Sequence, residues 1–304
     1  MQSSVPNSVR RLGIALLLAI SGVAHAQSGR FDNVVIETES LGDSVFMLTG
    51  AGGNMAVSAG PDGLLLVDDQ FAPLAQRIEA ALVALPETAP LSQRPLKYVI
   101  NTHHHGDHTG GNPHFAGLGA TLVASEPARV RLLDAASSPD APLPVITHHA
   151  GINIYFNGDR LRLLALTGHT DGDTAVYFER ANVLHTGDLF FNGRFPYIDL
   201  DSGGSVSAYL ASQTRMLGLI DDATRIVPGH GPLATKADLV GIHGVIKATR
   251  QLVLDAIQRG DNLQAIQARG LAPEFQGYAW SFIDVPRWLE ILYLDALNSD
   301  AESP

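Results

Sequence analysis

A dense run of metal-binding side chains, residues 102–111, constrains this chain more than any other feature of its sequence. The run reads Thr-His-His-His-Gly-Asp-His-Thr-Gly-Gly and follows an apolar segment, Leu96–Asn101, that is typical of a buried strand. Imidazole nitrogens and carboxylate oxygens are ligands that zinc accepts. The competing interpretation is a solvated histidine-rich turn that binds metal only adventitiously, as a purification tag does. Further histidines and aspartates downstream favour a true metal site.

The spacing within this run indicates how its side chains can be divided between two cations. In extended backbone, side chains two residues apart point to the same face, so His103 and His105 can converge on one ion. Gly106 permits a sharp turn, which would direct Asp107 and His108 towards a second ion close by. The run therefore predicts a site for two metals at the end of a strand.

The pattern H-x-H-x-D-H at the end of a strand resembles the defining motif of the metallo-β-lactamase superfamily. The remaining motifs of that family have counterparts here in the right order, and the resemblance runs from about residue 31 to 235. These counterparts are Asp68 at the end of Leu64–Val67, Thr167-Gly168-His169-Thr170, Thr186-Gly187-Asp188 and Pro228-Gly229-His230-Gly231.

The resemblance implies an α/β (α+β) fold, a four-layer αβ/βα sandwich with the metals at its edge. It implies two ions per chain, expected to be zinc, with iron or manganese as alternatives. His103, His105 and His169 would bind the first ion, and Asp107, His108 and His230 the second. Asp188 would bridge the two ions, and Asp68 would support the ligands from behind. All seven ligand positions of the family are filled.

Such a pair of metals has a clear chemical use. Two cations bridged by Asp188 and a water would lie about 3.5–4 Å apart and lower the pKa of that water, giving a hydroxide nucleophile at neutral pH. One metal could then polarise a carbonyl or phosphoryl oxygen. Asp107 could, besides binding metal, orient or receive a proton, and it is the predicted catalytic residue. No serine nucleophile is needed.

The identity of the bridging residue narrows the family branch. The most antibiotic-specific members place a cysteine ligand, or no bridging ligand, where this chain has Asp188. Aspartate there resembles glyoxalase II, lactonases, phosphodiesterases and processing nucleases. We predict hydrolysis of an ester, thioester, lactone, amide or β-lactam bond in a small substrate. Three alternatives stay open: a specific β-lactamase, an iron-dependent redox enzyme and a non-catalytic metal-binding module.

The first 26 residues read as an export signal. Arg10 and Arg11 precede the apolar run Leu12–Ala24, which ends in the small-x-small pattern Ala24-His25-Ala26. The run is too short to span a bilayer, which favours a cleaved signal peptide over an uncleaved anchor. We therefore predict a periplasmic or secreted protein without stable membrane insertion, exported by the general or the twin-arginine route.

Charge and cysteine content exclude several classes of function. The formal net charge is −11, which repels phosphate backbones and argues against a nucleic-acid partner. The chain has no cysteine, which excludes disulfides, cysteine-ligated metals and thiol nucleophiles. The remaining partner is a small-molecule substrate, and the sequence does not indicate an oligomeric state.

Apart from the export segment, no linker or repeat divides the chain, so residues 27–304 are predicted to form one domain. Apolar stretches predict strands, and 3.6-residue periodicity predicts helices. The strands are Asn33–Glu37, Ser44–Thr49, Met55–Ala59, Gly63–Asp68, Leu96–Asn101, Thr121–Ala124, Ile152–Phe156, Arg160–Leu166, Ala175–Phe178 and Asn182–His185. The helices are Pro73–Leu85, Pro127–Ala135, Val206–Leu219, Lys236–Gln258 and Val285–Leu297, the last as a closing helix packed on the core.

The segment Phe190–Tyr197 follows the predicted bridging aspartate and should lie at the mouth of the site. Asn192, Arg194 and Tyr197 are its candidate substrate-binding residues, because they could hold a carboxylate or carbonyl. The alternative is that its aromatic residues simply pack the loop.

Other polar residues near the motifs have less specific interpretations. His104 is expected in a supporting or packing role, and His185 either bonds a ligand or is structural. Asp171 and Asp173 either orient imidazoles or cap a turn. His148 and His149 are expected to be solvated. Ala51–Asn54 is expected to be a hairpin turn, or a flap over the site.

Overall fold

A computed structural model describes residues 29–85, 95–136 and 138–301. Its contacts divide the chain into a unit that ends at Val35 and a unit comprising Ile36–Pro304. In the first unit, the Val34 amide donates to the Phe31 carbonyl over 3.1 Å. The predicted signal peptide lies outside the described residues, so its cleavage and the single domain 27–304 stay predictions. Among the described helices, none is long and apolar enough to cross a membrane.

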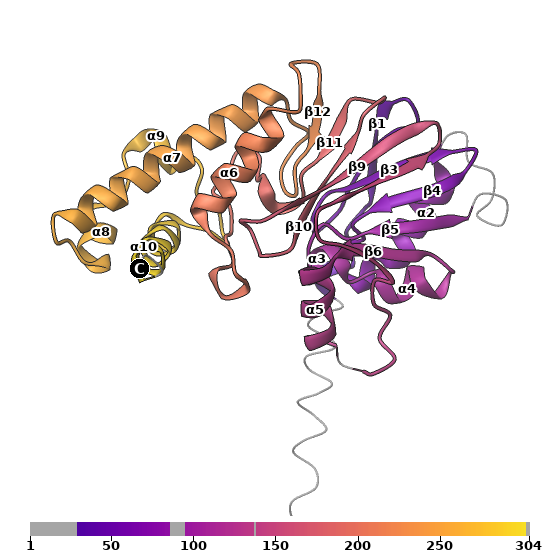
Figure 1. The fold of residues 1–304 in the computed structure, drawn as a ribbon, viewed down its shortest axis with the longest axis horizontal. Helices are drawn as coiled ribbons and strands as arrows, with labels where there is room; N and C mark the ends of the chain where they lie inside the picture. Colours follow the sequence, from indigo (N-terminus) through magenta and orange to yellow (C-terminus); the bar gives the residue numbers. More distant parts are fainter. Residues whose placement is uncertain (1–28, 86–94, 137, 302–304) are drawn as a thin grey trace, which may run out of the picture. The chain divides into compact units, whose positions relative to one another are not determined.

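The second unit contains two β-sheets. In its described residues, the first sheet has seven strands in chain order, antiparallel from β1 to β4 and parallel from β4 to β7 (Figure 1). These strands are β1 Glu37–Gly42, β2 Val45–Thr49, β3 Met55–Gly60, β4 Gly63–Val67, β5 Leu96–Ile100, β6 Thr121–Ser125 and β7 Ile146–His148.

The second sheet has five strands within the same described ranges, in the order β12-β11-β10-β9-β8. Only its pair β11–β12 is parallel. Its strands are β8 Ile152–Phe156, β9 Asp159–Leu166, β10 Asp173–Phe178, β11 Val183–His185 and β12 Arg225–Val227.

Helices cover the outer faces of both sheets. The helices α4 and α5 contact β5, β6 and β7 of the first sheet, whereas α6, α7 and α10 form the other outer layer. The longer helices are α2 Ala75–Ala84, α4 Asn112–Gly117, α5 Glu126–Asp134, α6 Val206–Leu217, α7 Lys236–Gln258, α8 Leu263–Arg269 and α10 Val285–Ala301; α3 Gly106–Thr109 and α9 Pro273–Gln276 are single turns, and η1 Ala72–Leu74, η2 Gly187–Leu189 and η3 Leu200–Ser202 are 3-10 turns.

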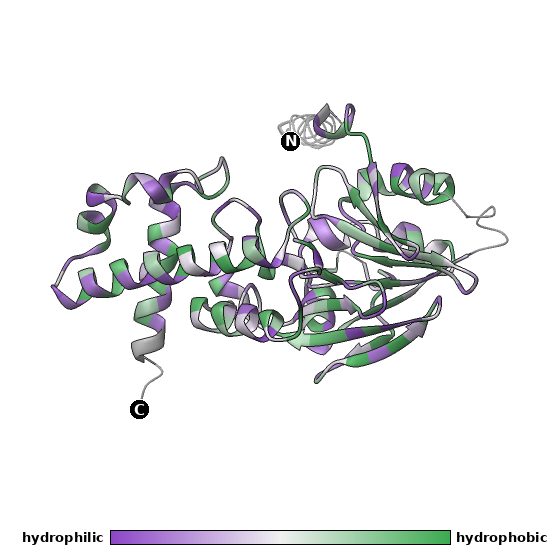
Figure 2. Ribbon diagram, turned by 90° about the horizontal axis from the view of Figure 1, so that it is seen from above, coloured by the Kyte–Doolittle hydropathy of each residue, from purple (hydrophilic) through white to green (hydrophobic). Residues whose placement is uncertain are grey.

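Two hydrophobic cores hold these layers together. One lies between the sheets and combines side chains such as Val67 and Ile100 with Val176 and Phe178. The other lies between the second sheet and its helices, where Trp288 is fully buried. Figure 2 shows hydrophobic colour along the strands and alternating polar and apolar residues along α7. Burial of this apolar surface is what makes the four-layer arrangement stable.

The long helix α7 shows how local sequence signals fix an element. Thr235 and Asp238 form a reciprocal capping box at its start, which satisfies amide groups that have no partner within the helix. Leu239, Ile242 and Ile246 then repeat at helical spacing and are all buried. The predicted bounds Lys236–Gln258 are confirmed.

The four-layer sandwich implied by the family resemblance is confirmed, but two local predictions, the first strand and the solvated His148, are wrong. The first strand is Glu37–Gly42 rather than Asn33–Glu37, because Asp43 and Ser44 adopt left-handed backbone and make a tight turn that pairs Gly42 with Val45. The turn predicted at Gly106 is a helical one, because the chain passes from extended backbone at His105 into α3, which carries Asp107 and His108. His148 is buried at the end of β7, a three-residue strand without a detectable alternating pattern.

Candidate metal centre

The candidate metal centre is built where strands end. In the first sheet, Asp68 follows β4, and His103 and His108 lie in the segment after β5. In the second sheet, Asp188 follows β11 and His230 follows β12. Both pairs of strands are parallel, so their carboxyl ends, and the loops that follow them, share one edge of each sheet. Ligand sites in α/β proteins form at such edges.

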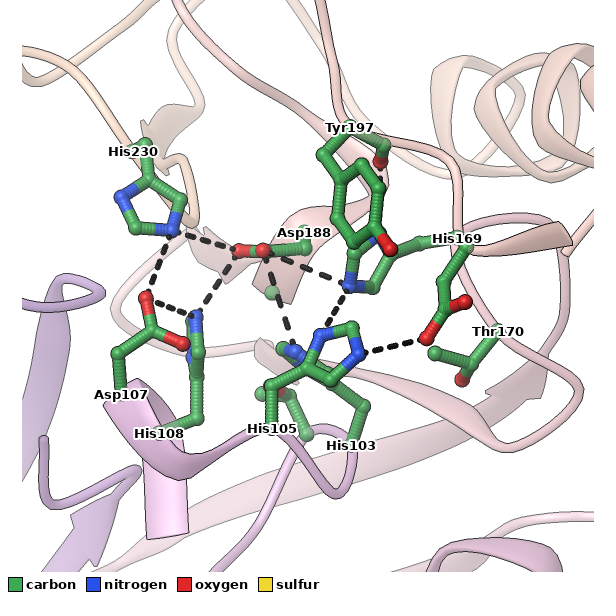
Figure 3. A network of polar contacts seen from close by, with 12 residues as sticks. His103, His105, Asp107, His108, His169, Thr170, Asp188, Tyr197 and His230 are labelled. Atoms are coloured by element: carbon green, nitrogen blue, oxygen red, sulfur yellow. Dashed lines mark hydrogen bonds and ion pairs between the residues drawn. The ribbon is translucent and has the colours of Figure 1, made fainter. Parts of the chain in front are cut away.

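Three imidazoles and one carboxylate form the first cluster, His103, His105, His169 and Asp188 (Figure 3). His169 Nε2 lies 2.9 Å from His105 Nδ1 and 3.5 Å from Asp188 Oδ2. His103 Nε2 lies 3.9 Å from the same carboxylate oxygen. The candidate ligand atoms of this cluster all lie within 4.8 Å of one another.

A second cluster, Asp107, His108 and His230, lies on the other side of Asp188. His108 Nε2 is 3.1 Å and His230 Nε2 is 3.4 Å from Asp188 Oδ1. Asp107 Oδ2 is 3.3 Å from His230 Nε2 and 3.7 Å from His108 Nε2. The structure thus brings all seven predicted ligand residues together, with one oxygen of Asp188 facing each cluster.

Hydrogen bonds fix which nitrogen of each histidine is free to bind a cation. His169 Nδ1 donates to the Tyr197 carbonyl over 2.8 Å, because a carbonyl can only accept, and this leaves Nε2 with its lone pair. His105 Nε2 donates to Asp199 over 2.9 Å, which leaves Nδ1 free. His169 Nε2 and His105 Nδ1 therefore face each other at 2.9 Å, an arrangement that a proton or a metal cation between them would stabilise.

The same logic extends to the histidines nearest β5. The Thr102 hydroxyl donates to Asp68 Oδ2 over 2.8 Å, so its oxygen accepts from His103 Nδ1, 3.0 Å away. Asp68 also accepts from His108 Nδ1 over 2.7 Å. His103 and His108 consequently direct their Nε2 atoms towards Asp188.

Three buried atoms at the centre of this arrangement have no hydrogen-bond partner: His103 Nε2, His108 Nε2 and Asp188 Oδ1. Buried polar atoms in folded proteins are nearly always paired, and an unpaired one is costly. Imidazole nitrogens and a carboxylate oxygen that lack hydrogen-bond partners are ligand atoms for metals, and their placement around Asp188 fits a pair of divalent cations. These ligand atoms are suited to zinc and also to iron or manganese.

Electrostatics differ between the two clusters. Burial lowers the pKa of His169 to about 4 and lowers that of His103 well below its usual value, in the latter case with help from neighbouring imidazoles. Both rings are therefore neutral, which is the metal-binding form.

The pKa values of the second cluster move the other way. Burial disfavours a charge on His108 and His230, but the Asp188 carboxylate and its neighbours outweigh it. They raise the pKa of His108 well above its usual value and that of His230 to about 9. Burial would raise the pKa of Asp188, yet the imidazoles around it hold that pKa well below its usual value. Positive charge is favoured here, as a proton or as a metal ion.

Asp68 and Asp199 support the clusters from behind, and only the first was predicted. Asp68 accepts the Thr102 amide over 2.8 Å in addition to the bonds above, and its own φ is +60°. Strained backbone of this kind persists where surrounding contacts hold it. Asp199 lies in the loop after the Phe190–Tyr197 segment, where no motif marks it.

Two glycines allow the backbone to approach the centre closely. A Cβ on Gly229 would lie 2.1 Å from Asp188 Oδ1, and one on Gly53 would lie 2.1 Å from the His108 ring. The loop 50–54 is the predicted hairpin connection between β2 and β3. Its Asn54 side chain donates to the carbonyls of Pro228 and Gly231, both at 2.8 Å. This loop therefore braces the two ligand segments against each other, a role that its sequence did not suggest.

The remaining polar candidates have structural roles. His185 accepts from the Gly187 amide and bonds the Asn54 carbonyl at 2.9 Å, without contact to a candidate ligand side chain. Asp173 accepts the backbone amide of His169, which caps the turn as the alternative interpretation had it. Asp171 pairs with Arg131 on the surface.

Three of the less specific candidates lie in different surroundings. His148 was expected to be solvated, but it is buried 3.4 Å from Thr174 Oγ1, whereas His149 is exposed. The ring of His104 lies 4.5 Å from that of His105, which is consistent with a packing role.

The predicted substrate-binding residues lie near the centre to different degrees. The Tyr197 ring lies 6.0 Å from the ring of His105. Arg194 lies over the Trp280 ring, 5.0 Å from its centroid. The Asn192 side chain donates to the Pro232 carbonyl over 3.1 Å, which holds the loop around His230. Substrate contact stays a prediction for all three.

Solvent reaches side chains of both clusters. The side chains of Asp107, His105 and His230 are 26%, 22% and 16% exposed, whereas Asp188 is only 5% exposed. A small molecule would therefore meet Asp107 and His230 before it reaches the bridging carboxylate.

Comparison with known proteins agrees with this geometry. The family model described as Metallo-beta-lactamase superfamily matches residues 49–230, which include all seven candidate ligands. A hydroxyacylglutathione hydrolase of Synechococcus sp. (strain JA-3-3Ab) is 30% identical over 138 residues, 43% of this chain and 48% of that protein. The 2,4-dinitroanisole O-demethylase subunit alpha of Nocardioides sp. (strain JS1661) is 26% identical over 227 residues, 73% of this chain and 66% of that protein. The chain thus spans between about half and two thirds of the length of these relatives.

Solved structures share the fold at low sequence identity. A metallo-beta-lactamase from Pontibacter korlensis has a TM-score of 0.60 at 17% identity, covering 70% of this chain and 99% of that one. A stereoselective inverting sec-alkylsulfatase from Pseudomonas sp. has a TM-score of 0.67 at 16% identity, covering 88% of this chain and 52% of that one.

Proposed function

Because this chain belongs to the metallo-beta-lactamase superfamily and carries its His/Asp metal site, we propose that it is a two-metal hydrolase of ester, thioester, lactone, amide or β-lactam bonds in small substrates. The observation that carries this proposal is the placement of Asp188, whose two oxygens each face a separate cluster of imidazoles. One carboxylate shared in this way is the ligand that a pair of metals needs.

His103, His105 and His169 would hold one ion, Asp107, His108 and His230 the other, with Asp188 shared, and zinc is the proposed metal. Bound metals of this kind supply Lewis acidity and lower the pKa of a water molecule. The chain's own contribution is positional: hydrogen bonds from behind orient the rings before substrate arrives. Asp107 is the proposed proton acceptor, and its 26% exposure, against 5% for Asp188, supports this role.

Among these bonds, a thioester or ester is the leading candidate. Supporting it are the hydroxyacylglutathione hydrolases to which the chain is similar and the aspartate at the bridging position. A specific β-lactamase is a narrower form of the same proposal. Iron at the site would favour the redox alternative, because histidine and carboxylate ligands also accept iron.

We also propose that the protein is exported and acts without a nucleic-acid partner. The apolar run Leu12–Ala24 behind two arginines supports export. The net charge of −11 supports a substrate other than a polyphosphate.

The test combines metal analysis with turnover on one sample. Protein purified from cells should contain about two zinc ions per chain, the number that this ligand set can hold. It should hydrolyse at least one of a hydroxyacyl-glutathione thioester, an activated carboxyl ester, a lactone or a chromogenic cephalosporin, and a chelator should abolish that activity.

The outcomes separate the alternatives. Rapid cephalosporin turnover alone would make the protein a β-lactamase that uses aspartate where others use cysteine. Iron in place of zinc, with no hydrolysis, would overturn the hydrolase proposal in favour of redox chemistry. Bound zinc without turnover of any of these bond types would favour a metal-binding module.

A further inference from the structure

A row of aromatic rings connects the two candidate metal clusters. It consists of Phe191, Tyr197, Trp280 and Phe282, here called the aromatic row. At one end, Phe191 stacks on His230 with ring centroids 4.9 Å apart and planes 21° apart. At the other end, Tyr197 lies 6.0 Å from His105 and 5.9 Å from His169. The row therefore begins at one cluster and ends at the other.

Contacts between the rings are continuous. Trp280 lies 6.3 Å from Phe191 and 5.6 Å from Phe282, and Phe282 lies 5.4 Å from Tyr197. These separations are typical of aromatic packing. Phe191 is buried, whereas Phe282 is 45% exposed and Trp280 and Tyr197 are partly exposed, so these three residues present ring surface to solvent.

The row is held in place by backbone contacts between two distant segments. Trp280 Nε1 donates to the Phe195 carbonyl over 3.0 Å, and the Phe195 amide donates to the Tyr278 carbonyl over 2.7 Å. The segment that carries Trp280 and Phe282, between α9 and α10, is thereby fixed to the loop after Asp188. Rings fixed in this way lose little conformational entropy when a ligand binds.

Two guanidinium groups lie on these rings. Arg194 lies over Trp280, and Arg287 lies over Phe282 and Tyr197, 4.2 Å and 5.5 Å from their centroids. Within the described ranges, neither arginine forms an ion pair with a carboxylate, although the chain as a whole carries a net charge of −11. Arg287 donates one bond, to the Phe282 carbonyl over 2.8 Å, which leaves most of its donors available.

The nearby carboxylates do not neutralise these two arginines. Asp199 is bonded to His105, and Asp284 accepts the Arg287 amide at the start of α10. Two cations without carboxylate partners on an aromatic surface favour a ligand that is both flat and negatively charged.

We propose that the aromatic row, with Arg194 and Arg287, selects a substrate that carries an aromatic group and an anionic group outside the bond to be cleaved. This inference rests on the proposed function, since it names the substrate class of that same centre. The aromatic group packs on Trp280 and Phe282, and the anionic group accepts hydrogen bonds from the arginines.

Calorimetric titration of the zinc-loaded full chain tests the proposal with three probes. The probes are 4-toluenesulfonate, methanesulfonate, which lacks the ring, and methyl 4-tolyl sulfone, which lacks the charge. Sulfonates are chosen because they bind metal much more weakly than carboxylates do. The aromatic sulfonate should bind about tenfold more tightly than either partial probe, as ring and charge contacts of modest strength combine.

Variants assign the selectivity to residues. Arg194→Gln should weaken binding of the aromatic sulfonate several-fold, by about the strength of one charged contact, and leave the sulfone unchanged. Arg287→Gln should have the same effect. Because Arg287 also bonds the Phe282 carbonyl, its loss could shift that ring, and Arg194→Gln tests the charge without this complication. Arg259→Gln, an exposed arginine paired with Asp261, is the matched control and should change nothing. Phe282→Leu should weaken both aromatic probes, whereas Tyr155→Leu on the edge strand β8 should weaken neither.

Equal affinity for 4-toluenesulfonate and methanesulfonate, or unchanged affinity in the Arg194→Gln/Arg287→Gln double variant, would overturn the inference. The proposed function is tested separately, by the metal analysis and turnover measurements described above. Selective binding without hydrolysis would leave the aromatic row as a recognition surface and discard the reaction. Hydrolysis without selective binding would support the proposed function and overturn the role of the aromatic row.

Discussion

The two candidate metal clusters share Asp188 but are built on different principles. In the first, three imidazoles are oriented by two neutral groups, the Thr102 hydroxyl and the Tyr197 carbonyl, and by one carboxylate, Asp199. In the second, two further carboxylates contribute: Asp107 is itself a candidate ligand, and Asp68 accepts a hydrogen bond from His108.

This difference indicates which interactions should supply the binding energy of each ion. The first cluster offers three nitrogen donors already directed at one point, so its affinity depends on ring orientation. The second offers two imidazoles and negative charge, so its affinity depends on carboxylates. Asp188 completes both, but the second cluster has only two imidazoles besides it, against three in the first, and should be the more sensitive to loss of its charge.

The largest expected effect therefore comes from Asp188→Ala. The three imidazoles of the first cluster should still hold one zinc, whereas the second ion should be lost. Activity should fall by more than about 100-fold, beyond the usual range for residues that only support ligands. Elemental analysis and steady-state kinetics on the same sample measure both effects. Two zinc ions per chain and an unchanged rate would remove the bridging assignment.

Gly229→Ala should have the next largest effect, because it disturbs the same carboxylate without removing it. The added methyl group would lie 2.1 Å from Asp188 Oδ1 and close to the Gly187 carbonyl, so the carboxylate must move. We expect loss of the second ion first and a fall in activity of about 100-fold. Gly244→Ala is the matched control, since nothing lies within 4 Å of the position of its Cβ. Equal zinc content in the two variants would contradict the close approach.

Asp68→Asn tests whether the second cluster depends on charge. The amide keeps a similar shape but removes the negative charge next to His108 and cannot accept all three bonds that Asp68 accepts. Affinity for the second zinc should fall about 10- to 100-fold, with a smaller change at the first. Competition with a fluorescent chelator measures the two affinities. Equal losses at both sites would mean that Asp68 acts on folding as a whole.

How far the sequence predicted these features depends on how local their signals are. The seven ligand positions and Asp68 sit in short motifs at strand ends, and the family resemblance that these motifs carry implied the four-layer sandwich. His148 shows the limit, because it was expected to be solvated, whereas a three-residue strand carries it inside next to Thr174. Such a strand is too short for an alternating pattern to appear.

Features that depend on distant segments could not be predicted. Asp199 reaches His105 across 94 residues, and Trp280 reaches the Phe195 carbonyl across 85. Gly53 looked like an ordinary turn residue, and only the packed structure shows the His108 ring against it. Periodicity and motif spacing describe neighbours along the chain, so they do not record contacts of this kind.

The smallest expected effect is that of Asp199→Asn, which tests the first cluster as Asp68→Asn tests the second. An asparagine oxygen can still accept the bond from His105 Nε2, so the ring keeps its orientation and loses only the charge behind it. If the first cluster depends on orientation, zinc affinity there should fall by less than about tenfold, the lower bound for residues that support metal ligands. Asp199→Ala removes the acceptor as well and should cost more, whereas Asp171→Asn, which alters a surface pair with Arg131, should cost nothing. A loss in Asp199→Asn as large as that in Asp68→Asn would show that charge governs both clusters, and the contrast between them would disappear.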